Sequence, residues 1–314
     1  TCHAPVSATA RRHPAGVMTA QAQAMQPAQR NLRWLPLRTH SQLANTSDDI
    51  ARNIESALGR NLRRYLEIAG KQRGTVSIVG SGPSLKRTWQ RIEKTGGDII
   101  ACNAACQFLL ERGIVPKYMM CFDADPLMLE FITAHKDITY LIGSRCPPEA
   151  FDMLEGCDIV CWHASGDEHI ESILQKHGRF DDPMIPGGSA AVTRGMIIAQ
   201  TLGYTDVHLW GADSSFEENG DTHIRKSTTL EKRMLVNCGG RVFETAPWMT
   251  VQIQDFKTLA PPLRDNYGVT FTVHGDGLLP QVAASMGFAV DWRLGVKQFL
   301  RQWKWNVVNL WQTI

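Results

Sequence analysis

The feature that most restricts the fold is a glycine turn between a short apolar run and a helix-like pattern. Residues 76–79 read VSIV, typical of a buried strand, and the GSG at 80–82 then turns the chain. Pro83 has a fixed φ that suits the first turn of a helix. Apolar residues follow at spacings of four and three, namely Leu85, Trp89 and Ile92. A turn of this kind points backbone N–H groups at one spot, so the sequence predicts a phosphate-binding loop.

The same alternation of strand and helix continues along the chain. Short apolar runs predict further strands at 98–103, 118–122, 138–142, 158–162, 207–210 and 269–273. Helical patterns separate most of them, including one at 190–202 that Gly203 can end. Buried strands that alternate with helices indicate a mostly parallel sheet. The predicted fold class is therefore α/β, a Rossmann-like sheet with helices on both faces.

Composition and pattern together divide the whole chain into four segments. Residues 1–30 are rich in Ala, Gln, Pro and Arg without an apolar period and predict a disordered leader, with a transit peptide as the alternative. Residues 31–73 predict a helical preface, in which Ser47 to Asp49 can cap a helix. The Rossmann-like domain is expected at 74–288, with an edge strand at 242–243 and a helix over 250–259 that the prolines at 261–262 end. Residues 289–314 predict an amphipathic, Trp-rich C-terminal helix that docks on protein, mediates self-association or touches a membrane surface.

Bulk properties exclude several classes of partner. The 314 residues carry a formal net charge of +2, which gives no general polyanion footprint, so no nucleic acid is expected. No apolar run approaches the roughly 20 residues of a membrane span. The eight cysteines include two pairs at x3 spacing, which is not the usual C-x2-C zinc pattern. Reduced core thiols and a cytoplasmic location are expected.

Known phosphate loops do not match the first glycine turn. A P-loop requires G-x4-G-K-[ST], and this spacing does not follow Gly80. A dinucleotide fingerprint requires a third glycine and an acid after the next strand. Leu85 and Asn103 occupy these two places, which disfavours a nicotinamide cofactor. A mononucleotide phosphate remains open, and so does a tight turn that binds nothing.

Polar side chains follow several of the predicted strands. Because ligands of parallel sheets bind at the carboxyl ends of the strands, we expect Ser81, Asn103, Asp123, Asp125 and Asp213 to converge. Asn103 could bond a ribose or a base. Asp123 and Asp125 could hold Mg²⁺ over phosphates or bind sugar hydroxyls, and N-capping is the structural alternative. Asp213 is also a candidate catalytic residue, with the same alternative.

A second turn and a histidine complete the predicted site. Gly187, Gly188 and Ser189 open the helix at 190–202 and could bind an anionic group of the transferred moiety. His223 lies in a polar loop after the Asp213 strand and is a candidate general acid or base. An exposed loop histidine is the alternative. His163 and His169, which flank another strand end, are weaker candidates.

Three ordered runs carry a family resemblance. They are IVGSGPSL at 78–85, CNAACQFLLERGIVPKYMMCFDADP at 102–126 and GGSAAVTRGMIIAQTLGYTDVHLWGADSSFEENGDTH at 187–223. Together they resemble the MptE-like family, which includes an archaeal 6-hydroxymethylpterin diphosphokinase and motility-associated factors linked to flagellin glycosylation. The order of motifs is also similar to that of bacterial sialyltransferases that use a CMP-sugar.

The resemblance implies a Rossmann-like nucleotide-binding transferase. It would hold the donor phosphates on Gly80, Ser81, Gly82, Pro83 and Ser84, contact the nucleotide through Asn103, and complete the pocket with Gly187 to Ser189. Glycosyl transfer from a nucleotide sugar to an unknown acceptor is the first expectation. Mg²⁺-dependent diphosphate transfer from ATP is the second, and a non-catalytic nucleotide-binding module is the third. The resemblance only suggests an acid–base role for His223, because its local context differs from that of the sialyltransferases.

Overall fold

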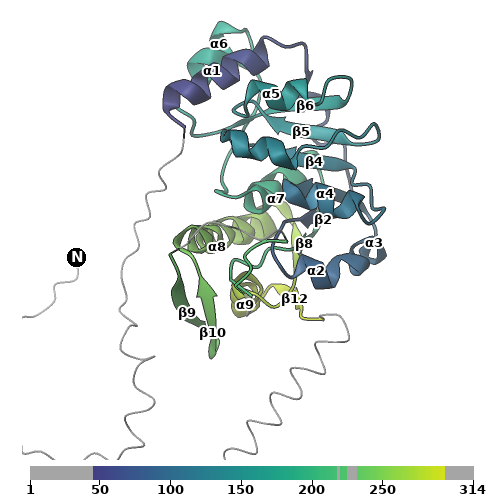
Figure 1. The fold of residues 1–314 in the computed structure, drawn as a ribbon, viewed down its shortest axis with the longest axis vertical. Helices are drawn as coiled ribbons and strands as arrows, with labels where there is room; N and C mark the ends of the chain where they lie inside the picture. The colour runs from purple at the N-terminus through teal and green to yellow at the C-terminus, as the bar shows by residue number, and fades with distance from the viewer. Residues whose placement is uncertain (1–44, 218–219, 225–231, 294–314) are drawn as a thin grey trace, which may run out of the picture. The chain divides into compact units, whose positions relative to one another are not determined.

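The computed structural model describes residues 45–217, 220–224 and 232–293. A parallel sheet forms its centre, with the strand order β1-β6-β5-β4-β3-β2-β8-β11-β12 and with β7 paired to β6 (Figure 1). The predicted α/β class and the mostly parallel sheet are confirmed. The strands are β1 Arg63–Arg64, β2 Thr75–Val79, β3 Asp98–Cys102, β4 Tyr118–Cys121, β5 Thr139–Gly143, β6 Asp158–Ala164, β7 Met184–Ile185, β8 Asp206–Trp210, β11 Thr270–His274 and β12 Ala289–Asp291.

Helices cover both faces because the strands carry apolar residues on both faces. In β2, Val76 and Ile78 join one core cluster and Val79 joins the other. The first cluster packs against α7 Ala191–Leu202, α8 Pro247–Tyr267, α9 Leu278–Ser285 and the 3₁₀ turn η1 Tyr65–Glu67. The second packs against α2 Leu85–Thr88, α3 Ile92–Thr95, α4 Ala104–Leu110 and α5 Pro148–Asp152, with the 3₁₀ turns η2 Trp89–Arg91 and η3 Pro126–Phe131.

Within the predicted helical preface at 31–73, the structure has helix α1 over Ser47–Leu58, followed by β1 and η1. The N-cap of α1 is Thr46, whose hydroxyl accepts the Asp49 amide, rather than one of the three residues from Ser47 to Asp49. The apolar stripe of α1, which includes Ile50 and Ile54, forms a third buried cluster with α6 Ile170–Lys176. This pair of helices lies at the β6 side of the sheet, away from β2 and β8 (Figure 1).

The segment after β2 is not one continuous helix, contrary to the periodicity of its apolar residues. It divides into α2, η2 and α3, each of three or four residues. The Thr88 hydroxyl donates to the Ser84 carbonyl, Arg87 pairs with Asp276 of the turn after β11, and Arg91 pairs with Asp291 of β12. Tertiary contacts therefore set this segment, since a helix of this length has little stability of its own.

Two further predictions are corrected in the C-terminal part. We expected a helix over 250–259 ended by prolines, but α8 runs through Pro261 and Pro262 and ends at Gly268 in the left-handed conformation. Its buried residues Phe256, Ala260 and Leu263 pack on the core, which compensates for the missing N–H groups. The edge strand expected at 242–243 is half of a separate antiparallel hairpin, β9 Met234–Cys238 with β10 Arg241–Thr245.

Most of the predicted terminal segments, at 1–30 and 289–314, lie outside the described residues. Residues 289–291, expected to begin the C-terminal helix, form strand β12, because they pair in parallel with β11. The remainder of that helix and the leader at 1–30 lie outside the described residues. The described part of the chain has no helix that is both long and apolar enough to span a membrane. Its cysteines are free thiols, and most of them are buried.

Candidate functional site

The order in which the chain adds strands to the sheet reverses between β2 and β8. From β2 the chain builds outward through β3, β4, β5 and β6, and it then returns to place β8 on the other side of β2. The helices after β2 cover one face, whereas α7 and α8, which flank β8 in sequence, cover the other (Figure 1). In open parallel sheets, ligands bind at such a point, beyond the carboxyl ends of the strands.

Glycine is required in the first turn because the loops after β2 and β8 touch. A Cβ atom at Gly80 would lie 2.5 Å from Val192 Cγ2 and 2.7 Å from the Gly211 carbonyl oxygen. A Cβ atom at Gly82 would lie 2.5 Å from the same oxygen and would overlap a carboxylate oxygen of Asp213. The turn is therefore packed against its neighbour along its length, with α7 beginning beside it.

Most amides of this turn are already bonded within the protein. The Gly80 and Gly82 amides donate to the carbonyls of Trp210 and Gly211, each at 2.8 Å. The Ser84 amide donates to Asp213 Oδ2 at 2.9 Å. Within the described part of the chain, the Ser81 amide has no acceptor, and Ser81 is half-buried. Ser81 is thus the residue of the predicted phosphate loop whose N–H group can serve a ligand.

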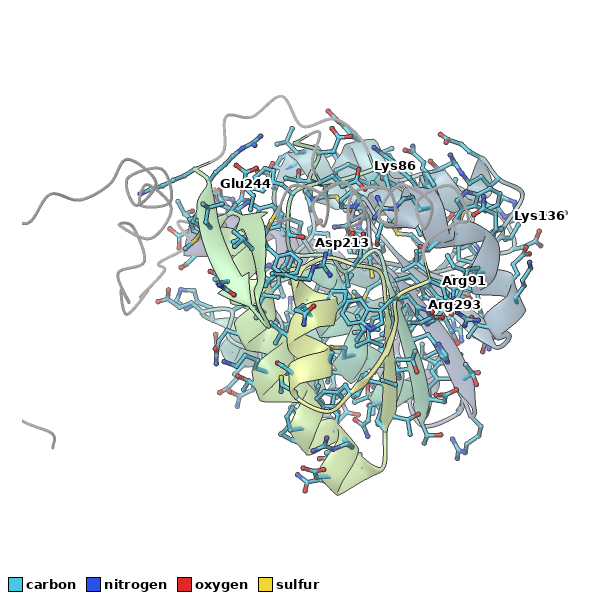
Figure 2. The ribbon with its side chains drawn as sticks, turned by 90° about the horizontal axis from the view of Figure 1, so that it is seen from below. Lys86, Arg91, Lys136, Asp213, Glu244 and Arg293 are labelled. Carbon is cyan, nitrogen blue, oxygen red and sulfur yellow. The ribbon has the colours of Figure 1, made fainter. Side chains whose placement is uncertain are left out.

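Asp213 lies deep between the loops rather than facing solvent. It is 3% exposed, and Figure 2 shows it in the interior of the ribbon, between the hairpin that carries Glu244 and the side that carries Lys86. Burial raises the pKa of its carboxyl to about 6, and the Ser84 hydrogen bonds oppose this shift. Because Asp213 is so deeply buried, it would influence a ligand only indirectly, through the residues that cover it.

Asn103 stands at the end of β3 in a conformation rare for any residue other than glycine. Its φ is 49° and its ψ is −127°, and the Cys121 thiol donates to Asn103 Oδ1 at 3.1 Å. The Asn103 side-chain NH₂ group has no acceptor among the described residues and is not fully buried. A strained backbone that directs an unused donor is a common property of binding positions.

Asp123 and Asp125 follow β4, and both bond their own loop. Asp123 Oδ1 accepts the Asp125 amide at 3.1 Å, and Asp125 Oδ1 accepts the Leu127 amide at 2.9 Å, which caps η3. Asp125 therefore takes the capping role that we considered as an alternative. Across the described residues, no group of three His, Cys, Asp or Glu side chains is arranged to hold a metal. The two carboxylates do not by themselves form a magnesium site.

The second glycine turn precedes α7 and is closed by a carboxylate. Gly187 and Gly188 have φ angles of 71° and 73°. Both the amide and the hydroxyl of Ser189 donate to Asp255 Oδ2 of α8, each at 2.6 Å. The buried Arg194 donates from Nε to the Gly188 carbonyl. Burial and the nearby Arg145 lower the pKa of Arg194 to about 10.

His223 lies on the loop after β8. The amide of its neighbour Ile224 donates to the Ser81 carbonyl at 2.8 Å, which places this loop directly beside the first glycine turn. The His223 ring stacks on Trp248 of α8, with ring centroids 5.7 Å apart and planes at 8°. Nδ1 lies 2.8 Å from the Thr222 hydroxyl. The imidazole is half-buried and is held on two sides.

The weaker histidine candidates lie elsewhere. His163 lies between the Ser144 hydroxyl, 2.9 Å from Nδ1, and Asp182 Oδ2, 3.3 Å from Nε2. This serine, histidine and aspartate are all buried, at 1%, 1% and 7% exposure, so the arrangement offers no accessible nucleophile. His169 is exposed beside α6. Neither histidine contacts the two glycine turns.

Sequence reasoning missed the ion pairs that tie the loops together. Arg87 of the α2 segment pairs with Glu217, from the loop after β8, and with Asp276, from the turn after β11. Lys86 pairs with Asp221, 3.0 Å away. At the outer edge, Arg91 and Arg293 both pair with Asp291 and lie side by side in Figure 2. Single charges separated by up to 200 residues carry no local sequence signal that could have revealed these pairs.

A stacked aromatic group beneath the β11 turn was also missed. The rings of Trp210 and His274 are 3.5 Å apart at 4°, and His274 Nε2 lies 2.9 Å from His208 Nδ1. Burial, together with the neighbouring His208, lowers the pKa of His274 to about 3, so this imidazole is neutral near pH 7. Because His274 is the last residue of β11, the contacts of its ring with Trp210 and His208 fix the start of the turn at 275–277.

Comparison with protein families gives one match. The model described as "6-hydroxymethylpterin diphosphokinase MptE-like" matches residues 48–219, which is more than half of the chain and includes both glycine turns, Asn103 and Asp213. No curated protein matches the chain in sequence.

Solved structures give the fold. A Maf glycosyltransferase from Magnetospirillum magneticum AMB-1 aligns with a TM-score of 0.57 and 18% identity, over 75% of this chain and 37% of that one. This chain therefore spans little more than a third of that protein. The sialyltransferase CstII from Campylobacter jejuni aligns with a TM-score of 0.33 and 15% identity, over 69% of this chain and 85% of that one.

Proposed function

Because the chain belongs to the MptE-like family, we propose that it is a transferase with a nucleotide-activated donor and that it transfers a glycosyl group. The observation that supports the proposal is the close approach of three of the predicted segments. The Gly80 turn touches the 211–213 turn, α7 begins beside Gly80, and the His223 loop bonds Ser81. The fold shared with a Maf glycosyltransferase supports the glycosyl reading.

The donor would lie across the carboxyl ends of β2 and β3. The Ser81 amide is the N–H group available to a phosphate oxygen, because Gly80, Gly82 and Ser84 donate internally. The Asn103 NH₂ group is available to the nucleotide. The turn at Gly187 and Gly188 precedes α7, which begins beside Gly80, and we assign this turn to the transferred moiety. This division leaves the glycines the role of bringing the loops together.

We assign acid–base work to His223. Its ring is oriented by Trp248 and by the Thr222 hydroxyl, so it is held in place before a ligand arrives. A positioned imidazole can protonate a departing phosphate or accept a proton from the acceptor hydroxyl, which contributes roughly 10²–10⁴-fold in rate. The Ser81 amide would stabilise the negative charge that develops on the leaving phosphate.

Diphosphate transfer from ATP is the second candidate, favoured by the description of the matching family model. It would use Mg²⁺, for which Asp123 and Asp125 are the predicted ligands. Both carboxylates are partly engaged in their own loop, and no wider group of ligands surrounds them among the described residues. This engagement is why glycosyl transfer is preferred.

A melting-temperature panel separates the candidates. The full chain is heated with CMP, UDP, GDP or ATP, each with and without Mg²⁺, because a ligand that binds only the folded state raises its stability. At a hundred times Kd the gain is about 2.7 kcal/mol. Stabilisation by CMP, UDP or GDP without metal supports the glycosyltransferase reading, and stabilisation by ATP that requires Mg²⁺ supports the diphosphokinase.

The remaining outcomes are equally decisive. Suppose that a nucleotide binds but that the protein does not release this nucleotide from its sugar conjugate with any acceptor that is supplied. This result would favour a non-catalytic binding module. A protein that responds to none of the four nucleotides would contradict the proposal.

A further inference from the structure

Three loops meet at Asp213. Its carboxylate accepts the Ser84 amide, and its own backbone carbonyl accepts the Leu279 amide of α9 at 3.0 Å. The turn after β11 packs on it so closely that a Cβ atom at Gly277 would lie 2.5 Å from the Asp213 carbonyl oxygen. One residue thus joins the glycine turn after β2, the loop after β8 and the turn after β11.

The same packing prevents Asp213 from touching a ligand. At 3% exposure its carboxylate is enclosed by Ser84, Gly82 and Gly275. Oδ1 and the Ser84 hydroxyl oxygen are both fully buried, and both face the position that a Cβ atom would take at Gly275. A group that reacted with a donor or an acceptor would need to be accessible from outside, and this carboxylate is almost completely buried.

We propose that Asp213 is a positioning residue, which sets the donor turn through the Ser84 amide and takes no part in bond making. The proposal rests on the function proposed above, because it assigns this turn to the donor. Ser84 is the last residue before α2, and Ser81 stands three residues earlier. Fixing Ser84 at one end, while the Gly80 and Gly82 amides fix the other, leaves Ser81 held with its N–H group unused.

The charges around the carboxylate support a fixed arrangement. Arg87, from the α2 segment, and Asp276, from the turn after β11, act on the pKa of this carboxyl in opposite directions, and they pair with each other. Glu217, from the loop after β8, completes this set by pairing with Arg87. The loop that carries Asp213 and the two segments packed against it therefore each contribute one side chain to this set of ion pairs.

The experiment compares Asp213→Asn, Asp213→Ala and Asp213→Ser with the natural full-length chain. Asparagine keeps an oxygen that can accept the Ser84 amide, whereas alanine and serine are too short to reach it. Serine retains a polar group should the alanine variant fold poorly. Asp137→Ala, an exposed carboxylate before β5, is the matched control. Amide hydrogen exchange at Ser84 and the dissociation constants of CMP, UDP, GDP and ATP are measured for each.

We expect exchange at Ser84 to accelerate by about tenfold or more in the alanine and serine variants, as for loss of a bond to a charged acceptor. The nucleotide that binds the natural chain should lose affinity by about tenfold in both variants. The asparagine and Asp137 variants should keep both values within about threefold, because the bond to Ser84 is retained.

Two results would overturn the positioning role. Unchanged exchange at Ser84 in the alanine and serine variants would show that Asp213 does not hold the turn. Faster exchange with undiminished nucleotide affinity would show that the hold does not serve the donor. If the natural chain binds none of the four nucleotides, the proposed function fails and the donor role of Asp213 fails with it, while exchange still reports whether the turn is held.

Discussion

At the scale of single residues, the glycines at 80 and 82 bring loops together. Side chains there would collide with the Gly211 carbonyl and with Val192 or Asp213. Their amides bond the β8 loop, so they do not form the open phosphate cradle that the motif indicates. We therefore propose that Ser81 and Asn103 face the ligand, because the Ser81 amide and the Asn103 NH₂ group have no acceptor among the described residues.

Substitution of Gly82 should therefore damage stability as well as binding. From the sequence we expect Gly82→Val to abolish nucleotide binding and leave the fold intact. The structure changes this expectation, because the valine would collide with the 211–213 turn. The unfolding free energy should fall by about 1–3 kcal/mol, as for other overpacked sites. Denaturant titration measures it.

Gly59→Ala is the control for Gly82, since a Cβ atom there would meet neighbours at an ordinary 3.5 Å. A Gly82→Val protein that unfolds at the same denaturant concentration as the natural chain would show that the two loops can separate freely.

His223→Ala should separate catalysis from binding. The ring stacks on Trp248 and is not part of the glycine turns, so donor affinity should change by less than about threefold while turnover falls by about 10²–10⁴. Release of nucleotide from the donor under saturating conditions gives turnover, and calorimetry gives affinity. His135→Ala, a histidine near the start of β5, is the matched control. Turnover of the His223 variant equal to that of the control would remove His223 from the mechanism.

At the scale of elements, helix α8 connects the site to the core. It carries Trp248 against His223 near its start and Asp255 against Ser189 two turns later. Its lower half passes through two prolines, which local propensity reads as a stop. The helix continues because burial of Phe256, Ala260 and Leu263 on the sheet outweighs the lost hydrogen bonds.

Pro262→Ala should stabilise the protein. Pro262 is exposed and contributes little packing, and the substitution restores an N–H group that can bond the Thr258 carbonyl. We expect a gain of about 1 kcal/mol, since the helical penalty of proline exceeds its benefit in the unfolded chain. Pro247→Ala, at the first position of α8 where proline is well tolerated, should give no gain. Equal effects at both positions would show that the interior proline carries no helical penalty.

At the scale of the whole molecule, loops from both halves of the sheet share one buried carboxyl, so its protonation is linked to global unfolding. The pKa of Asp213 is raised to about 6, above its ordinary value of 3.8, because the carboxyl is buried. The folded state therefore binds this proton more tightly than the unfolded state does. The resulting stability is fully present below about pH 4 and is lost as the pH rises through about 6.

Asp213→Asn should remove this contribution, because the amide does not titrate. Between about pH 5 and pH 7.5, the natural chain should lose about 1 kcal/mol of unfolding free energy relative to the asparagine variant. The comparison cancels the other titrating groups. A difference that stays constant across this range would place the pKa of Asp213 near its ordinary value.

Local pattern was sufficient for the fold class, whereas the assembly of the candidate site stays a prediction. Apolar runs and glycine turns alone placed β2 to β6, β8, β11 and α7 and indicated that Ser81, Asn103, Asp213 and His223 meet near one edge of the sheet, because carboxyl ends of parallel strands converge whatever the side chains are. Only the tertiary structure decided which atoms remain for a ligand. The amides of Gly80, Gly82 and Ser84, the carboxylates of Asp213 and Asp255, and the ion pairs of Arg87 find partners far away in the chain. A residue's type is written in the sequence, but whether its hydrogen-bonding groups are already used depends on neighbours that folding brings to it.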